Sequence, residues 1–178
     1  KTKLLNLKNP YLGYSYSNRE IKNIINKNDE LKKFHIKYYE KKKDLLKEIS
    51  NLIFENKILG FFNGRMEFGA RALGNRSILA NPCNPKIREI INEKIKKRES
   101  FRPFAPAIMK EQKKDWFKSN KCNPFMSSVE EIKLEKRKLI PSVTHIDGTG
   151  RVQTVTKENN EDFYMLIKYF SEISGVPI

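Results

Sequence analysis

The stretch Ile58–Pro82, ILGFFNGRMEFGARALGNRSILANP, determines the fold expected for this sequence. Its first residues, ILGFFNG, predict a buried strand that ends in an Asn-Gly turn, and SILAN near its end predicts a second short strand. Between the strands a glycine recurs at every fifth position, and an arginine closely follows each one. These residues are Gly64, Gly69 and Gly74, with Arg65, Arg71 and Arg76. Five is neither a helical nor a strand period, so we expect an irregular loop at a strand end, the usual place for a ligand crevice in open α/β sheets.

Interleaved glycines and arginines are suited to binding an anion. Glycine lets the backbone approach a ligand and turn its N–H groups toward it, and guanidinium groups add the neutralising charge. The pattern leaves two interpretations open: the loop binds an anionic ligand, or its arginines pair with carboxylates of the domain itself. Its spacing matches neither the phosphate-binding pattern G-x-x-x-x-G-K-[ST] nor the dinucleotide-binding pattern G-x-G-x-x-G.

The rest of the chain mixes helix and strand patterns, which predicts an α/β or α+β domain. Ser17 and Glu20 have the spacing of a capping box and begin a helix. Further helices are expected at about 42–56, from Asn84 onward, over QKKDWF, and at about 161–173, where Gly175 ends the last one. Strands are expected in FHIKYY (34–39), the second half of SFRPFAPAIMK (100–110), PFMSSVEEI (124–132), the final GVPI, and a hairpin around Asp147-Gly148 in residues 140–155.

Length and composition are typical of one domain that buries its own core. The 178 residues contain no apolar run long enough to span a membrane and begin with no signal-peptide pattern. The two cysteines, Cys83 and Cys122, lack metal-ligand spacing and are too few for a disulfide framework. We therefore expect a cytoplasmic protein that has no contact with a membrane.

The net charge of +15 is typical of nucleic-acid binding, but lysine and arginine are distributed differently. Residues 1–57 hold thirteen lysines and one arginine, which indicates solvated helix faces. Six of the nine arginines fall between Arg65 and Arg102. Because guanidinium groups bind carboxylate or phosphate bidentately, we interpret the arginine cluster as the sign of a site. A basic nucleic-acid-binding module remains the alternative, and a purely structural domain would leave the arginine cluster unexplained.

A second group of cations lies in KKRESFRPF, residues 96–104. Lys96, Lys97 and Arg98 are explained by the favourable interaction of cations with a helix C-terminus. Arg102 lies beyond that helix, in extended backbone before Pro103, so the same explanation does not cover it.

A third candidate segment is THIDGTGRVQ, residues 144–153, in which Arg151 stands alone. On the pattern, the Asp-Gly pair is as well explained by a simple turn. His145 by itself is typical of a hydrogen-bonded packing residue, because no second histidine or nearby cysteine supports a catalytic triad or a metal site.

Four motifs occur in order along the chain: GRMEFGARALGNRSILANP, INEKIKKRESFRPFAPAIM, PFM and VTHIDGTGRVQTV. Together they closely resemble the C-terminal domain of O-carbamoyltransferases of the nodulation-protein (NodU) and cephalosporin-carbamoylating (CmcH) type. The resemblance runs from about Asn9 to Ile178. The motifs are long and unusual, which makes a chance match very improbable.

The resemblance implies a YrdC-like fold, a twisted mixed sheet flanked by helices, that binds carbamoyl phosphate and ATP and makes carbamoyl adenylate. Magnesium is expected as the counter-ion of the nucleotide. A separate N-terminal domain with an actin-like ATPase fold, which holds the metal site and the acceptor site of the family, is implied as the partner that transfers the carbamoyl group to a hydroxyl. Residues 1–16 are then expected to be a lead-in from that domain, and residues 17–178 a C-terminally truncated carbamoyltransferase domain.

The resemblance also assigns the site residues. The family's catalytic anion- and nucleotide-binding positions match Arg71, Lys96, Arg102 and Arg151, which we expect to converge on one pocket. The neighbouring positions of the same motifs are Arg65, Gly69, Gly74, Asn75, Arg76, His145 and Thr149. No metal ligand is expected in this domain, and the chemistry needs cationic stabilisation of phosphate oxygens rather than a protein nucleophile.

The sequence departs from the family pattern in three places. Ala70 stands where the family often has proline, and Gly150 stands where alanine is common. The family also continues after GVP into a polar stretch of the Asn-Thr-Ser-Phe-Asn type that lines the same pocket, whereas this sequence ends at Ile178. The identity of the acceptor is not encoded in these motifs.

Overall fold

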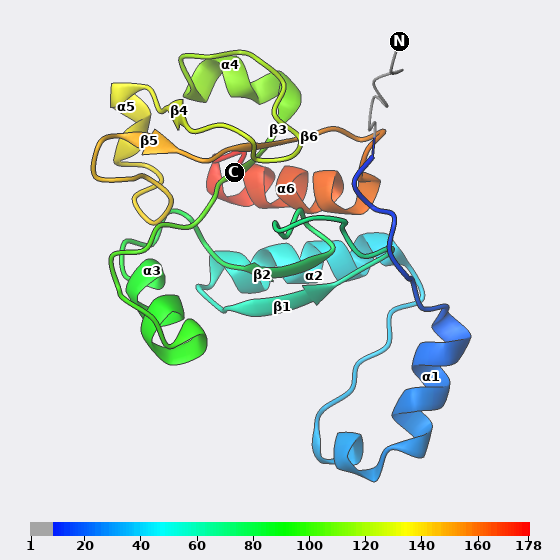
Figure 1. Cartoon of the computed structure of the whole chain (residues 1–178). Helices are drawn as coiled ribbons and strands as arrows, with labels where there is room; N and C mark the ends of the chain where they lie inside the picture. Colours follow the sequence, from blue (N-terminus) through cyan, green and yellow to red (C-terminus); the bar gives the residue numbers. More distant parts are fainter. Residues whose placement is uncertain (1–8) are drawn as a thin grey trace.

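The computed structural model describes residues 9–178 and shows one α+β domain, as the sequence predicts. The strands form three separate two-stranded sheets, two antiparallel and one parallel, among helices of three to fourteen residues (Figure 1). The pairing is mixed, as expected, but within the described residues the strands are too short to join into one continuous sheet.

The sheet that carries the glycine-arginine loop consists of β1 (Leu59–Phe62) and β2 (Arg76–Leu79). The two strands are antiparallel, with Leu59 opposite Leu79 and Phe62 opposite Arg76. The loop of residues 63–75 therefore leaves and re-enters the sheet at the same end. Both strands and the loop between them were predicted from the sequence.

Two long helices, α2 (Lys42–Phe54) and α6 (Glu161–Ser174), lie side by side in Figure 1 and contribute to both clusters of the core, which also contain buried residues such as Ile108, Trp116 and Ile132. Their apolar faces are buried, and the Ser50 hydroxyl donates to the Leu166 carbonyl across the interface at 3.1 Å. The Asn160 side chain caps the start of α6. Gly175 ends the helix in the left-handed conformation, which is the end that the sequence predicts.

The segment 140–155 does not form the predicted hairpin. Asp147 and Gly148 do form a turn, but β5 (Thr149–Gly150) pairs with β4 (Glu130–Glu131), and β6 (Gln153–Val155) pairs in parallel with β3 (Ala107–Met109). The local turn pattern was correct, and the partners of the strands come from distant segments that no local pattern specifies. Of PFMSSVEEI, only the end is a strand.

Residues 17–40 project from the body of the molecule in Figure 1. Ser17 and Glu20 form the predicted capping box of α1 (Asn18–Lys27), which has no buried residue. The 3-10 helix η1 (Asp29–Lys33) follows. The predicted strand FHIKYY is absent, because these exposed residues meet no strand of the described part of the chain with which to pair.

The predicted helix after Asn84 is divided. A short α-helix, α3 (Ile87–Ile90), continues into a π-helical turn, η2 (Ile91–Lys96), and Lys97 then turns the chain in the left-handed conformation. Ile87 and Ile91 are buried, whereas Ile95 is exposed. The remaining short helices are η3 (Lys110–Gln112), α4 (Lys113–Trp116) and α5 (Leu134–Arg137). No helix in residues 9–178 combines the length and the apolar character needed to cross a bilayer.

Candidate functional site

A cavity of about 490 Å³ lies between β2, the α3–η2 helix, residues 103–107 and α6. Its volume is within the range of sites for small molecules. Four cationic side chains line it, and none of its lining residues is acidic. The cations are Arg71, Lys96, Arg98 and Arg151. This cavity is therefore chemically suited to an anion.

Three of the four arginine and lysine residues that the resemblance assigns to one pocket line this cavity. Arg71 comes from the glycine-arginine loop, Lys96 from the end of η2, and Arg151 from the turn between β5 and β6. Arg151 is half-buried, while Arg71 and Lys96 are exposed. None of the three side chains has an ion pair or hydrogen bond to another described residue, so their donors are available to a ligand.

Arg102 does not line the cavity in this structure. Its guanidinium group pairs with Glu99 at 3.1 Å, and its side chain is 53% exposed. The Arg102 backbone N–H also donates to the Glu99 carbonyl at 3.2 Å, so Arg102 is turned toward Glu99 by both its backbone and its side chain. The convergence expected from the sequence therefore includes Arg71, Lys96 and Arg151, and the structure places Arg102 outside it.

Arg98 takes the fourth cationic position, although in the sequence this residue is explained by the favourable interaction of cations with a helix C-terminus. Its Nε donates to the Asn92 side chain at 2.8 Å, and its guanidinium group lies over the Phe104 ring at 5.0 Å. Asn92 is fully buried, and its amide donates to the carbonyls of Ser100 and Arg102. Asn92 thus shapes the whole 98–102 loop, and the π-helical turn is what places it there.

Two arginines of the glycine-arginine loop bind the protein's own backbone. Arg65 donates to the carbonyls of Leu12 and Gly13, at 3.2 and 3.0 Å. Arg76 donates to the Asn63 carbonyl at 2.7 Å and stacks on the Phe62 ring at 3.5 Å. Neither interpretation drawn from the sequence, a ligand or a carboxylate, describes these two residues. They fix the loop and the preceding segment to each other.

The N–H groups of the loop also point inward. Leu73, Asn75 and Arg76 donate their backbone N–H groups to one carboxylate oxygen of Glu67, at 2.7, 2.7 and 3.2 Å. Burial raises the pKa of the Glu67 carboxyl, but these backbone hydrogen bonds outweigh it and hold the pKa below its usual range. One of the two interpretations left open by the sequence was an anionic ligand bound to this loop, and the anion that its backbone N–H groups bind is the carboxylate of Glu67.

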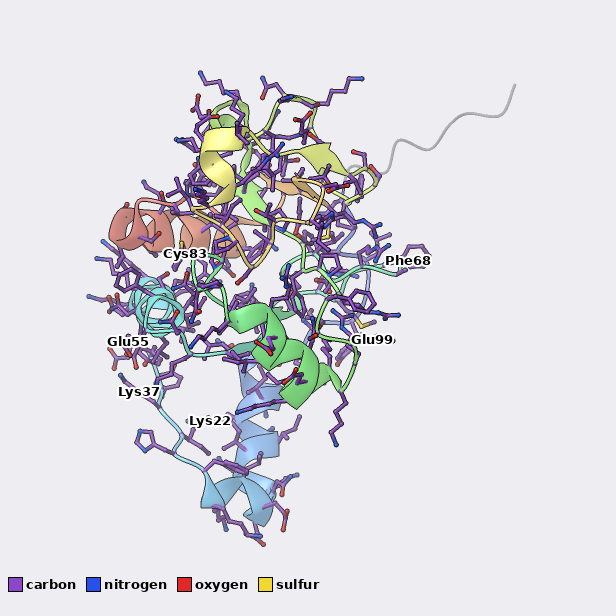
Figure 2. The ribbon with its side chains drawn as sticks, turned by 90° about the vertical axis from the view of Figure 1, so that its left-hand side faces the viewer. Lys22, Lys37, Glu55, Phe68, Cys83 and Glu99 are labelled. Carbon is purple, nitrogen blue, oxygen red and sulfur yellow. The ribbon has the colours of Figure 1, made fainter. Side chains whose placement is uncertain are left out.

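The other loop residues assigned by resemblance have structural contacts. Asn75 is buried, donates to the Arg65 carbonyl and accepts from Asn160, which caps α6. Gly74 lines the cavity and has a φ of +106°, with the Phe163 ring packed against it. Gly69 is exposed, with a φ of +115°. Figure 2 shows the adjacent Phe68 pointing away from the body of the molecule, and its side chain is 72% exposed.

His145 lies in the cavity lining, and its Nδ1 is 3.0 Å from the Thr149 hydroxyl. Thr149 does not line the cavity, and its contribution is this hydrogen bond to the His145 ring. Burial lowers the pKa of His145, and the positive charges of Arg151 and Arg88 lower it further, against the opposing effect of Asp147. The pKa of His145 therefore responds to the positive charge of Arg151, which lines the same cavity.

Removing one of these charges is expected to raise the pKa of His145. In Arg151→Ala the imidazolium form no longer faces that cation, so protonation becomes easier and the midpoint moves upward. The chain has only two histidines, so a proton NMR pH titration in a His35→Gln background follows His145 alone. If the pKa of His145 falls or stays unchanged in Arg151→Ala, the positive charge of Arg151 does not act on the His145 imidazole.

No cluster of three or more His, Cys, Asp or Glu side chains in residues 9–178 has the arrangement of a metal site.

The sequence profile of the family described as "Carbamoyltransferase C-terminus" matches residues 50–178, which is well over half of the chain. The chain belongs to this carbamoyltransferase family. The matched region contains every cavity residue described above and begins within α2. The projecting residues 17–40 precede it.

Relatives extend the similarity beyond this region. An uncharacterized protein of Methanocaldococcus jannaschii is 38% identical over 175 residues, which cover 98% of this chain and 34% of that protein. Nodulation protein NolNO of Sinorhizobium fredii is 41% identical over 138 residues, covering 76% of this chain and 20% of its own length. Nodulation protein U of the same organism is 33% identical over 133 residues, covering 75% and 23%. This chain thus spans about a third or less of the length of these relatives.

Proposed function

We propose that this chain is the domain of an O-carbamoyltransferase that binds carbamoyl phosphate and ATP and forms carbamoyl adenylate. The observation that carries the proposal is the cavity: three cations from three separate family motifs line it together with Arg98, and no acidic residue faces them. Membership of the carbamoyltransferase family supplies the substrate class. The similarity to nodulation proteins supports the same choice.

The proposed reaction has two steps whose charges match this cavity. Hydrolysis of carbamoyl phosphate breaks its carbon–oxygen bond to phosphate and gives carbamate and inorganic phosphate. An oxygen of carbamate then bonds to the α-phosphorus of ATP, the bond to the β-phosphate oxygen breaks, and pyrophosphate leaves. Both steps place negative charge on phosphate oxygens, which fixed guanidinium and ammonium groups stabilise without a protein nucleophile.

The positions of the side chains suggest how the task is divided. Arg151 is half-buried beside His145, a setting in which a bidentate contact with phosphate gains most from reduced solvent screening. Arg71 and Lys96 lie on the exposed side and suit the outer phosphates of a nucleotide. The apolar side chains of α6, including Phe163 and Phe170, line the inner part of the same cavity and exclude water from it.

Magnesium is expected to enter with the nucleotide. Its preferred ligands are oxygen atoms, often carboxylates, and the lining residues of this cavity carry no carboxylate. The residues present therefore do not fit a protein-held magnesium ion, and the steps above assign none of the chemistry to one.

We also propose that an N-terminal domain of actin-like ATPase fold transfers the carbamoyl group to an acceptor hydroxyl. The relatives are about three or more times as long as the matched region, which leaves room for such a domain in those proteins. A cytoplasmic location follows from the proposed use of ATP and carbamoyl phosphate.

The nucleic-acid alternative has less support from the structure than the net charge suggests. Four of the five lysines of residues 32–42 pair with carboxylates: Lys32 with Asp29, Lys33 with Glu30, Lys37 with Glu48 and Lys42 with Asp162. These pairs reduce the positive potential of this segment, whereas the cavity brings four cations together with no acidic residue in its lining.

The test is to supply the 178-residue chain with ATP, carbamoyl phosphate and magnesium, and to follow pyrophosphate and carbamoylated product separately. We expect pyrophosphate release that depends on carbamoyl phosphate, without transfer to an added acceptor. A chain that neither binds ATP nor releases pyrophosphate contradicts the proposal. Efficient carbamoylation of an acceptor by this chain alone would show that the transfer step is assigned to the wrong domain.

A further inference from the structure

Glu67 is the buried carboxylate of the glycine-arginine loop, and only 8% of it is exposed. One of its oxygens accepts three backbone N–H groups, from Leu73, Asn75 and Arg76. The remaining N–H group of this run, that of Gly74, donates to the Ser77 hydroxyl at 3.0 Å. All four consecutive N–H groups are therefore used inside the domain.

The same short segment is also held from its carbonyl side. The Leu73 carbonyl accepts hydrogen bonds from the Gln153 amide at 2.9 Å and from the Tyr11 hydroxyl at 2.7 Å. Arg71 lies two residues earlier and contributes to the cavity lining, without a partner of its own among the described residues. The conformation of the segment that follows Arg71 is thus determined by contacts that converge on Leu73.

We propose that Glu67 is a positioning residue: its carboxylate closes the amide nest of the loop from within and thereby holds Arg71 at the anion cavity. This inference rests on the proposed function of the cavity. Backbone N–H groups that a loop of this kind offers to phosphates elsewhere are here bound to an internal anion. The phosphates of the ligand are therefore held by the side chains of Arg71, Lys96, Arg98 and Arg151.

Two physical effects of Glu67 on an anionic ligand have opposite signs, which makes the proposal testable. A carboxylate close to the cavity repels an anion, so charge alone predicts that neutralising Glu67 strengthens ligand binding. If Glu67 instead orders the loop, neutralising it weakens ligand binding, because Arg71 is then held less firmly at the cavity. In Glu67→Gln an oxygen acceptor remains, but hydrogen bonds from the amides to a neutral acceptor are weaker than those to a carboxylate, so the loop and Arg71 become less ordered.

The experiment measures ATP binding to the 178-residue chain by calorimetry for the wild type, Glu67→Gln, Arg71→Ala and the double variant. The matched control is Glu130→Gln, which neutralises a carboxylate of similar exposure, 7%, that pairs with Lys113 at 2.6 Å and does not line the cavity. We expect Glu67→Gln to raise the Kd for ATP about five- to tenfold, as the difference between a charged and a neutral acceptor implies. Glu130→Gln removes the carboxylate partner of the buried Lys113 and is expected to lower stability, but to change the Kd of the folded chain for ATP by less than about twofold.

The double variant separates positioning from a general loss of stability. If Glu67 acts through Arg71, then Glu67→Gln has little further effect once Arg71 is alanine. Tighter ATP binding in Glu67→Gln, or equal losses in Glu67→Gln and Glu130→Gln, overturns the proposal.

A wild-type chain that binds no ATP would defeat the proposed function. In that case the Glu67 proposal is still tested by NMR. The backbone N–H groups of Leu73, Asn75 and Arg76 all bind the same carboxylate oxygen, so we expect the chemical shifts of all three to change in Glu67→Gln. Amide shifts that stay in place would defeat the Glu67 proposal independently.

Discussion

Replacing Arg151 with alanine is expected to weaken binding of ATP and of carbamoyl phosphate by about 10- to 150-fold, the equivalent of losing a charge-assisted hydrogen bond worth about 1.5–3 kcal/mol. Arg151 is half-buried in the cavity lining and has no ion pair or hydrogen bond to another described residue. Its whole capacity for a bidentate contact is therefore available to the ligand. Calorimetry with each ligand separately measures the loss. Arg151→Lys should recover only part of it, because an ammonium keeps the charge but not the planar pair of donors.

The matched control for this loss is Arg137→Ala. Arg137 is also a half-buried arginine, but it pairs with Glu131 at 3.2 Å, donates to the Ile132 carbonyl and is not in the cavity lining. Its removal lowers the net charge by the same amount, so it is expected to leave ligand binding nearly unchanged. Equal losses in the two variants would mean that binding follows overall charge, which is the behaviour of the nucleic-acid alternative.

Arg102→Ala is a useful third arm of the same experiment. The resemblance assigns Arg102 to the anion site, whereas the structure pairs it with Glu99 outside the cavity. A loss as large as that of Arg151→Ala would require Arg102 to leave Glu99 and turn inward when the ligand binds. An exposed ion pair of this kind is worth little, so that exchange is inexpensive.

The sequence predicted best those features that local patterns determine. The capping box at Ser17, the strands on either side of the glycine-arginine loop, and the end of α6 at Gly175 each depend on a few adjacent residues, and the structure has all of them. The family resemblance added Arg71, Lys96 and Arg151, which come from separate segments and line one cavity. Composition and periodicity alone could not have joined those segments.

The features that sequence reasoning missed depend on contacts between distant or unpatterned residues. Glu67 is a single acidic residue among arginines and has no local sign of burial, yet the loop folds around its carboxylate. In the sequence, Asn92 is an ordinary polar residue of a predicted helix. In the structure it lies in the π-helical turn, where its buried side chain accepts a hydrogen bond from Arg98. Both residues are single polar side chains beside a glycine-rich or basic loop, and this pattern is too common in sequences to assign a role to either one.

Replacing Gly74 with alanine is expected to destabilise the fold by about 2–5 kcal/mol, from backbone strain of about 1–2 kcal/mol and overpacking of about 1–3 kcal/mol. Its φ of +106° is a conformation that residues with a side chain rarely adopt. A Cβ atom at this position would lie 2.3 Å from Cδ1 of Phe163, a buried ring of α6. Urea unfolding followed by the fluorescence of Trp116, the single tryptophan, measures the loss.

Gly69→Ala separates the two causes. Gly69 has a similar φ of +115°, but no described atom outside its immediate neighbours lies within 4 Å of the position that a Cβ would take. We therefore expect it to cost only the backbone strain, about 1–2 kcal/mol. If both glycines cost the same, contact with Phe163 contributes nothing, and the close approach of the loop to α6 is not what requires glycine at position 74.

The contact itself is tested by combining Gly74→Ala with Phe163→Leu. A smaller side chain at 163 leaves room for the new methyl group, so the double variant should be more stable than the sum of the two single losses implies, by about 1–3 kcal/mol. The backbone strain should remain, because no change at 163 alters the φ of residue 74. Simple additivity would remove the steric explanation. A positive coupling would show that the packing of Gly74 against Phe163 of α6 also holds the glycine-arginine loop beside the cavity.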